Sequence, residues 1–198
     1  MISELLYLAI KVLSYIFNAI FRMGYFPPIW KISLIIMIPK ISKHLTNCSS
    51  YRPISLTPSM SKLFERVLLA KLQKFLETKN VIPHHQFGFR AKHGTIEQVN
   101  RITNEIRRTF EEKKYCSAVF LDVAQAFDKV WHAGLIHKIK KFLPSNTHEV
   151  LVSYLSDRKF RVKYKDFVTT DHHINAGVTQ GSVLGPILYL LYTCRFTD

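Results

Sequence analysis

The residues best suited to chemistry are a carboxylate and an aromatic ring in the string LDVAQAFDKVWH, residues 121–132. Asp122 follows an apolar run at residues 115–121, and Phe127 comes shortly after it. A carboxylate at the end of a buried strand is costly unless a positive charge lies beside it. A Mg²⁺ ion held by few carboxylates together with substrate phosphates is one such arrangement. For an aspartate taken alone, a helix N-cap or a surface ion pair is the more frequent role.

The composition indicates a folded domain with a polyanionic partner. The chain has 198 residues with 28 Lys and Arg against 14 Asp and Glu, and its formal net charge is +14. A hydrophobic fraction of 47% is enough to form a core. The positive net charge favours nucleic acid as the partner. The cysteines Cys48, Cys116 and Cys194 lie far apart without metal-ligand spacing, which fits a reduced, intracellular compartment.

Hydrophobic periodicity predicts the helices that must position these residues. The apolar spacing in residues 3–23 favours a helix packed on a core over a membrane segment. A capping box between Thr95 and Gln98 is expected to start another helix. The predicted helices are residues 3–23, 59–79, 95–110 and 129–142, and a proline-led apolar stretch follows at residues 186–192.

Three runs predict strands. Residues 31–39 are rich in isoleucine, and residues 115–121 are almost continuously apolar, so both are expected to be buried. Residues 160–165 alternate and carry a basic outer face formed by Lys159, Arg161, Lys163 and Lys165. Binding to a nucleic-acid backbone and simple solvation of a hairpin fit this face equally well. The expected fold class is α+β.

Five blocks in order resemble the reverse transcriptase of non-long-terminal-repeat (LINE-type) retrotransposons, in particular the jockey-like group. Together they span almost the whole chain, so their joint specificity exceeds that of any one short motif. The blocks are MIPK at 37–40, SYRPISLTPSMSKLFERVL at 50–68, HQFGFR at 85–90 with HGTIEQV after it, VFLDVAQAFDKVWH at 119–132 and AGVTQGSVLGPILYLLYT at 176–193.

The resemblance implies a role for each of several residues around Asp122. Asp122 would be the first of three carboxylates that bind two Mg²⁺ (or Mn²⁺) ions, with the Val123 carbonyl as a further ligand. Phe127 would lie under the sugar of the incoming nucleotide and exclude a 2′-hydroxyl. Asp128 is not a metal ligand in such enzymes, and a cap for the helix predicted from residue 129 is its expected role.

The resemblance also implies groups that hold the nucleotide. Arg52 would bind the triphosphate through its guanidinium, and Lys40 would act as a point charge. Gln180 would lie beside the sugar, while Gly181 would let the backbone approach the substrate closely. Two departures from the family pattern are PKISK for PKPGK and VTQG for VPQG, which change the loops that carry Lys40 and Gln180.

The implied architecture is a partial right-hand polymerase. It would have an N-terminal helical extension at residues 1–30, fingers at 31–114 and a partial palm at 115–198, with a hairpin near 158–175. The implied activity adds deoxynucleoside triphosphates to the 3′-hydroxyl of a DNA primer on an RNA template. How such elements insert suggests a nuclear location.

The family's aromatic-Ala-Asp-Asp box does not occur in the sequence. The polypeptide is therefore expected to be C-terminally truncated and inactive alone. Three hypotheses remain open: a reverse-transcriptase segment, a non-catalytic RNA-binding remnant and a decayed, non-functional product. RNA affinity that falls steeply with salt would separate the second from the third.

Overall fold

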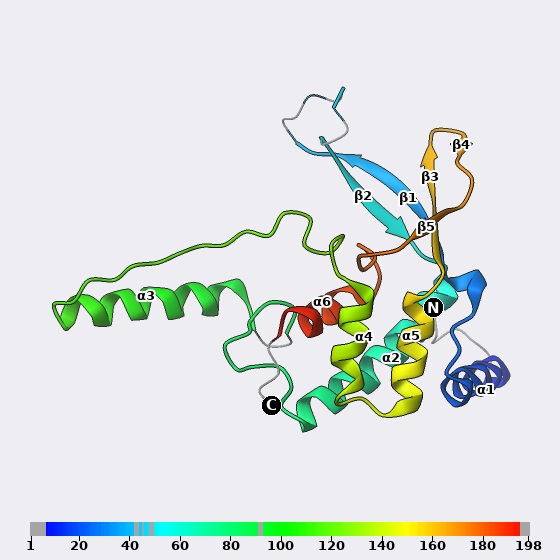
Figure 1. Cartoon of the computed structure of the whole chain (residues 1–198), viewed down its shortest axis with the longest axis horizontal. Coiled ribbons are helices and arrows are strands. Elements are labelled where there is room, and N and C mark those ends of the chain that lie inside the picture. Colours follow the sequence, from blue (N-terminus) through cyan, green and yellow to red (C-terminus); the bar gives the residue numbers. More distant parts are fainter. Residues whose placement is uncertain (1–6, 42–43, 45, 48–49, 91–92, 195–198) are drawn as a thin grey trace.

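The computed structural model describes residues 7–41, 44, 46–47, 50–90 and 93–194. A body of helices carries a sheet that projects from one side of it, and one helix stands apart (Figure 1). The helices are α1 (Tyr7–Met23), α2 (Ser59–Thr78), α3 (Thr95–Glu111), α4 (His132–Lys140), α5 (Ser145–Leu155) and α6 (Gly185–Thr193), with a 3-10 turn, η2 (Pro28–Trp30). The strands are β1 (Ile32–Pro39), β2 (Tyr51–Leu56), β3 (Arg158–Tyr164), β4 (Phe167–Val168) and β5 (His172–Ile174).

The core of the body forms around Phe64 on α2, whose side chain is fully buried. Its ring lies 5.2 Å from the rings of Phe17 and Phe21 and 5.8 Å from that of Phe26, measured between centroids. Leu68 and Leu72 continue the same stripe, one helical turn apart, and neither is exposed. The apolar periodicity of residues 59–79 therefore predicted this helix and its buried face correctly.

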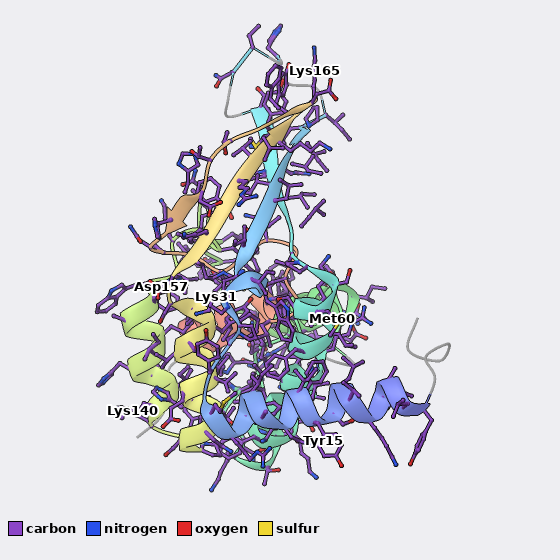
Figure 2. The ribbon with its side chains drawn as sticks, turned by 90° about the vertical axis from the view of Figure 1, so that its right-hand side faces the viewer. Tyr15, Lys31, Met60, Lys140, Asp157 and Lys165 are labelled. Carbon is purple, nitrogen blue, oxygen red and sulfur yellow. The ribbon has the colours of Figure 1, made fainter. Side chains whose placement is uncertain are left out.

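The sheet is mixed, with strand order β2-β1-β3-β4 and β5 paired to the other part of β3. β1 pairs antiparallel with β2 and parallel with β3, in a register that places Ile32 opposite Lys159. A parallel pair needs a crossover, and α2 to α5 lie between these two strands in the chain. Figure 2 shows Lys31 and Asp157 where the sheet meets the helices and Lys165 at its far tip. The predicted α+β class is thus confirmed.

The arm, defined here as residues 95–123, contains α3 and the chain that follows it. α3 buries none of its residues, and Ile96 and Phe110 are 75% and 69% exposed. It extends away from the body in Figure 1. The predicted capping box is wrong by one position, because Gly94 is the N-cap and its N–H donates to Glu97 Oε2 at 2.8 Å.

The predicted strand at residues 115–121 is wrong. The chain there has no regular secondary structure, and Phe120 and Leu121 are 80% and 89% exposed. A strand needs a neighbour for its backbone hydrogen bonds, and in the described part of the chain none of the ladders includes these residues. The apolar side chains of residues 115–121 could be buried, but no described strand pairs with this segment.

Other boundaries shift by smaller amounts. The helix predicted at residues 129–142 is confirmed only as α4, His132–Lys140, since residues 124–129 form turns. The proline-led stretch at 186–192 forms α6, whose second residue is Pro186. α5 and β2 were not predicted from the sequence. Of the described helices, none combines the length and the apolar character needed to cross a bilayer.

Candidate nucleotide and nucleic-acid site

Two segments far apart in the sequence meet beside the sheet. The Val178 N–H donates to the Phe127 carbonyl and the Gly177 N–H to the Val130 carbonyl, each at 2.8 Å. Gly177 has φ +88°, and a Cβ there would lie 2.8 Å from the carbonyl oxygen of Asp128. Only glycine allows this close approach without strain. The loop that carries Gln180 is therefore fixed against the segment that carries Phe127.

The same loop also contacts β2. The Ser55 N–H donates to the Gln180 carbonyl at 3.0 Å, and Gly181 adopts φ +99°. A Cβ at Gly181 would lie 2.8 Å from the Ser55 carbonyl oxygen, so β2 leaves no space for a side chain here. The approach of this glycine to a substrate stays a prediction. The segments that carry Phe127, Gln180 and Gly181 are thus brought together beside β2.

The Phe127 ring is half-buried between two other aromatic rings. It stacks on Tyr189 of α6, with centroids 4.9 Å apart and an interplanar angle of 22°. Phe89 meets it edge-on at 5.7 Å and 90°. Offset stacks and edge-to-face pairs restrict an aromatic ring to one orientation, so Phe127 is held by packing. Phe89 comes from the HQFGFR block, which the sequence analysis did not connect to this site.

Asp128 corrects one prediction. It is not a helix cap, because α4 begins at His132 with Trp131 as its N-cap. The Asp128 carboxylate instead accepts a hydrogen bond from Gln180 Nε2 at 3.3 Å, across 52 positions of sequence. Asp128 therefore orients the side-chain amide of Gln180. Nothing in the spacing of the two residues indicates this contact.

Asp122 and Val123 lie in the exposed, irregular part of the arm, and Val123 is 59% exposed. Among the residues that the structure describes, no cluster of three His, Cys, Asp or Glu side chains could hold a metal ion. Mg²⁺ is usually held by one or two carboxylates, and water and substrate phosphates complete its six oxygen ligands. The described residues by themselves do not complete a divalent-cation site.

Arg52 and Lys40 lie on the hairpin formed by β1 and β2. Arg52 pairs with Ile38 and is exposed, while the Lys40 N–H donates to the Ser50 carbonyl at 2.7 Å. Ile54 shares a face of β2 with Arg52, and its Cγ2 would lie 3.8 Å from a Cβ at Gly181. Two residues of a strand span about 7 Å, so Arg52 lies about 7 Å along β2 from Ile54, the residue next to Gly181.

The basic face of β3 divides into two pairs. Arg161 Nε lies 2.5 Å and Lys159 Nζ 3.6 Å from the carboxylate of Asp171. The hydrogen bond from Arg161, aided by the charges of both cations, lowers the pKa of Asp171. Lys163 and Lys165 make no such ion pair with a described carboxylate. These two lysines, nearer the sheet's tip, are therefore the ones free of a neutralising partner in the described chain.

Glu65 on α2 is a site residue that was not predicted from the sequence. Its side chain is fully buried and accepts hydrogen bonds from the N–H groups of Val183 and Leu184. The sequence does contain a pattern that could have predicted this buried carboxylate. Ser61 and Glu65 lie on the apolar stripe of α2 that continues through Leu68 and Leu72. A carboxylate on a buried stripe requires hydrogen-bond donors nearby.

Comparison with known proteins identifies the family. Residues 38–197 match the family model described as "Reverse transcriptase (RNA-dependent DNA polymerase)", so the chain belongs to the reverse transcriptase family. The chain is 48% identical over 185 residues to a "Probable RNA-directed DNA polymerase from transposon X-element" of Drosophila melanogaster, covering 93% of this chain and 20% of the relative.

A second relative is the "RNA-directed DNA polymerase from mobile element jockey" of Drosophila melanogaster. It is 45% identical over 184 residues, which cover 93% of this chain and 20% of the relative. The "Retrovirus-related Pol polyprotein from type-1 retrotransposable element R1" of Bradysia coprophila is 29% identical, over 85% of this chain and 16% of the relative. The predicted likeness to jockey-type non-LTR retrotransposons is confirmed, and the chain spans about a fifth of the length of the first two relatives.

Proposed function

We propose that this chain is the fingers and part of the palm of a retrotransposon polymerase that adds deoxynucleotides to a primer 3′-hydroxyl on an RNA template. The observation that carries the proposal is the meeting of Phe127, Gln180 and Gly181 beside β2. These residues come from two blocks of the family pattern, and hydrogen bonds of 2.8 to 3.3 Å connect the blocks. In this proposal residues 31–114 are fingers and residues 115–198 belong to the palm.

The chain's own residues would bind and orient the nucleotide. The Phe127 ring, held by Tyr189, would lie against the sugar and leave no space for a 2′-hydroxyl. Gln180, oriented by Asp128, would present its amide beside the same sugar. Arg52 would bind phosphate oxygens from the exposed face of β2, and Lys40 would add a second positive charge.

Two divalent cations belong to the complete enzyme in this proposal. Asp122 and the Val123 carbonyl would supply two of their ligands, and the ions would neutralise charge on the phosphates. The aromatic-Ala-Asp-Asp box that would supply the remaining carboxylates does not occur in the sequence. We therefore propose that a polypeptide of these 198 residues does not extend a primer by itself.

Nucleotide binding provides the decisive experiment. The chain is incubated with an RNA–DNA template-primer, Mg²⁺ and a photoreactive deoxynucleoside triphosphate, and unlabelled deoxy- and ribonucleotides compete for crosslinking. The deoxynucleotide should compete better, and F127A should reduce this preference about tenfold or more, because the ring that contacts the sugar is gone. The matched control is F120A, whose ring is 80% exposed in the arm. Equal competition by both nucleotides in the unaltered chain would rule out the proposed site.

Primer extension in the same mixture tests the second part of the proposal. No extended primer is expected with Mg²⁺ or Mn²⁺. Metal-dependent extension by the purified chain would show that the described carboxylates suffice and would overturn the predicted inactivity.

The basic hairpin gives a separate test of RNA binding. D171N removes the carboxylate that pairs with Arg161 and Lys159, so RNA affinity should rise several-fold. The slope of log affinity against log salt should steepen by roughly 0.7 for each phosphate newly neutralised on a single strand. K163A with K165A should have the opposite effect. Unchanged affinity in both variants would place RNA elsewhere on the molecule.

A further inference from the structure

A buried carboxylate on α2 is hydrogen-bonded to the backbone that follows Gln180 and Gly181. Glu65 Oε2 accepts hydrogen bonds from the Val183 N–H at 2.8 Å and the Leu184 N–H at 3.2 Å. The hydroxyl of Ser61, one helical turn earlier, donates to Glu65 Oε1 at 3.0 Å. The side chain has no exposed surface. Three donors therefore satisfy the carboxylate in the protein interior.

We propose that Glu65 is a positioning residue for the nucleotide: it fixes the loop 179–184 so that the Gln180 side chain faces the site. This inference rests on the proposed function, because it assigns Gln180 to the nucleotide. Glu65 does not touch the substrate in this arrangement. It acts through the backbone N–H groups three and four positions after Gln180.

The loop's own hydrogen bonds do not explain the carboxylate. Ser182 Oγ donates to the Thr179 carbonyl at 2.9 Å and accepts from the Gly185 N–H at 2.9 Å, which already closes the turn and begins α6. The N–H groups of Val183 and Leu184 are left over, and a neutral side chain could have accepted from either. Glutamate gives charge-assisted bonds, which are about twice as strong as neutral ones, next to the positive end of the α6 dipole.

The other side of the loop is already fixed. Gln180 is held to β2 through the Ser55 N–H, and its side chain is held by Asp128. Glu65 adds a contact from α2, the helix that contains the centre of the core. Gln180 is thus held from three elements. If the hydrogen bonds from Val183 and Leu184 to Glu65 are lost, the loop keeps only its contacts with β2 and Asp128 and can rotate about them.

A buried tyrosine and a buried arginine lie in the same part of the body. Tyr154 is 1% exposed, and burial raises the pKa of its hydroxyl while the nearby Arg158 lowers it and Glu65 raises it further. The Arg158 guanidinium is also 1% exposed, and its centre lies 4.5 Å from the Tyr154 ring centroid. Glu65 and Arg158 therefore act on the same buried hydroxyl with opposite signs.

Hydrogen exchange of backbone amides tests the positioning directly, without any nucleotide. In E65Q the amides of Val183 and Leu184 should exchange about ten- to a hundredfold faster, since a hydrogen bond to a charged acceptor is replaced by a weaker one. Amides of Leu68 and Leu151, buried in the body, should keep their rates. S61A removes one donor from the carboxylate and should give a smaller increase at the same two amides. This milder variant decides the question if E65Q does not fold.

A double-mutant cycle connects the loop to the nucleotide. E65Q should weaken deoxynucleotide crosslinking about tenfold when Gln180 is present and have little further effect in a Q180A background, because residues acting through one contact are not additive. If Glu65 has a purely structural role, the losses of crosslinking are additive: E65Q weakens crosslinking equally with Gln180 present and in the Q180A background. That result would overturn the inference. So would unchanged exchange at Val183 and Leu184.

The two proposals fail in different ways. If the unaltered chain crosslinks no deoxynucleotide, the proposed function fails, while faster exchange in E65Q still supports Glu65 as the residue that holds the loop. If crosslinking occurs with deoxynucleotide preference but E65Q does not change it, the proposed function stands and the role of Glu65 is refuted.

Discussion

Phe64 in the body and Phe120 in the arm both belong to strongly apolar stretches, but their environments are opposite. Phe64 has no exposed surface and packs edge-on or tilted against four aromatic rings. Phe120 is 80% exposed. An apolar pattern makes a residue available for burial, whereas burial itself needs a second surface of matching shape. The body has five helices that supply such surfaces to one another, and the arm lacks a described partner.

Stability is distributed unevenly in this chain. In the body, buried leucines and aromatic rings on α1, α2, α4, α5 and α6 form one continuous cluster. In the arm, α3 has a well-formed apolar face at Ile96 and Val99 that stays exposed. Local regions with few buried contacts open far more often than the core does. Four predictions follow this contrast from the largest effect to the smallest.

Limited proteolysis should show the contrast most strongly. Trypsin should cleave after Lys113 and Lys114 in the arm at least about a thousandfold faster than after Lys71 and Lys74 in α2, because cleavage in the core helix requires global unfolding. Mass spectrometry of timed digests measures both rates. Simultaneous appearance of fragments cut at the two places would show that the arm is packed as tightly as the body.

Matched phenylalanine substitutions test the same contrast by stability. F64A should lower the free energy of unfolding by about 3–5 kcal/mol, through lost burial and the cavity left behind. F120A should change it by no more than about 0.5 kcal/mol, since its ring is already in water. Urea unfolding followed by circular dichroism measures the two values. Similar losses for the two variants would mean that Phe120 has a partner in solution.

Gly181 marks the contact between the body's last loop and the sheet. G181A should cost about 1–3 kcal/mol, because alanine is strained at a left-handed φ. Its Cβ would also lie 2.8 Å from the Ser55 carbonyl oxygen. G88A is the control, as its Cβ would only meet a side-chain atom of Gln86 at 3.4 Å. Thermal unfolding of both variants checks the difference, and an unaffected G181A would contradict the close contact with β2.

The smallest effect is expected on the surface of α3. Glu105 pairs with Arg108 at 2.6 Å, and their side chains are 58% and 65% exposed. E105A should therefore change stability by no more than about 0.5 kcal/mol, as exposed ion pairs in helices usually do. Helicity and urea midpoint measured at low and high salt provide the check. A loss above 1 kcal/mol, on the order of a buried contact, would indicate that α3 is part of a larger packed unit.

Much of the fold could be predicted from local patterns. The apolar spacing on α2, the isoleucine-rich β1 and the alternation in β3 each reflect how one element presents its own faces. α5 escaped prediction because residues 145–155 mix β-branched, aromatic and polar side chains, and its buried face depends on contact with α1 and α4. The strand predicted at residues 115–121 failed for a related reason, since a strand's hydrogen bonds are made with another segment.

Motif order and periodicity were enough to predict the family and the α+β class, because neither depends on the path of the folded chain. The roles of Asp122, Phe127 and Gln180 stay predictions from the family resemblance. The hydrogen bonds of Asp128 to Gln180 and of Glu65 to the following loop became evident only in the folded chain. Those contacts join residues 52 and 118 positions apart. Periodicity says which face of a helix is apolar, but the path of the folded chain decides which distant backbone groups that face meets.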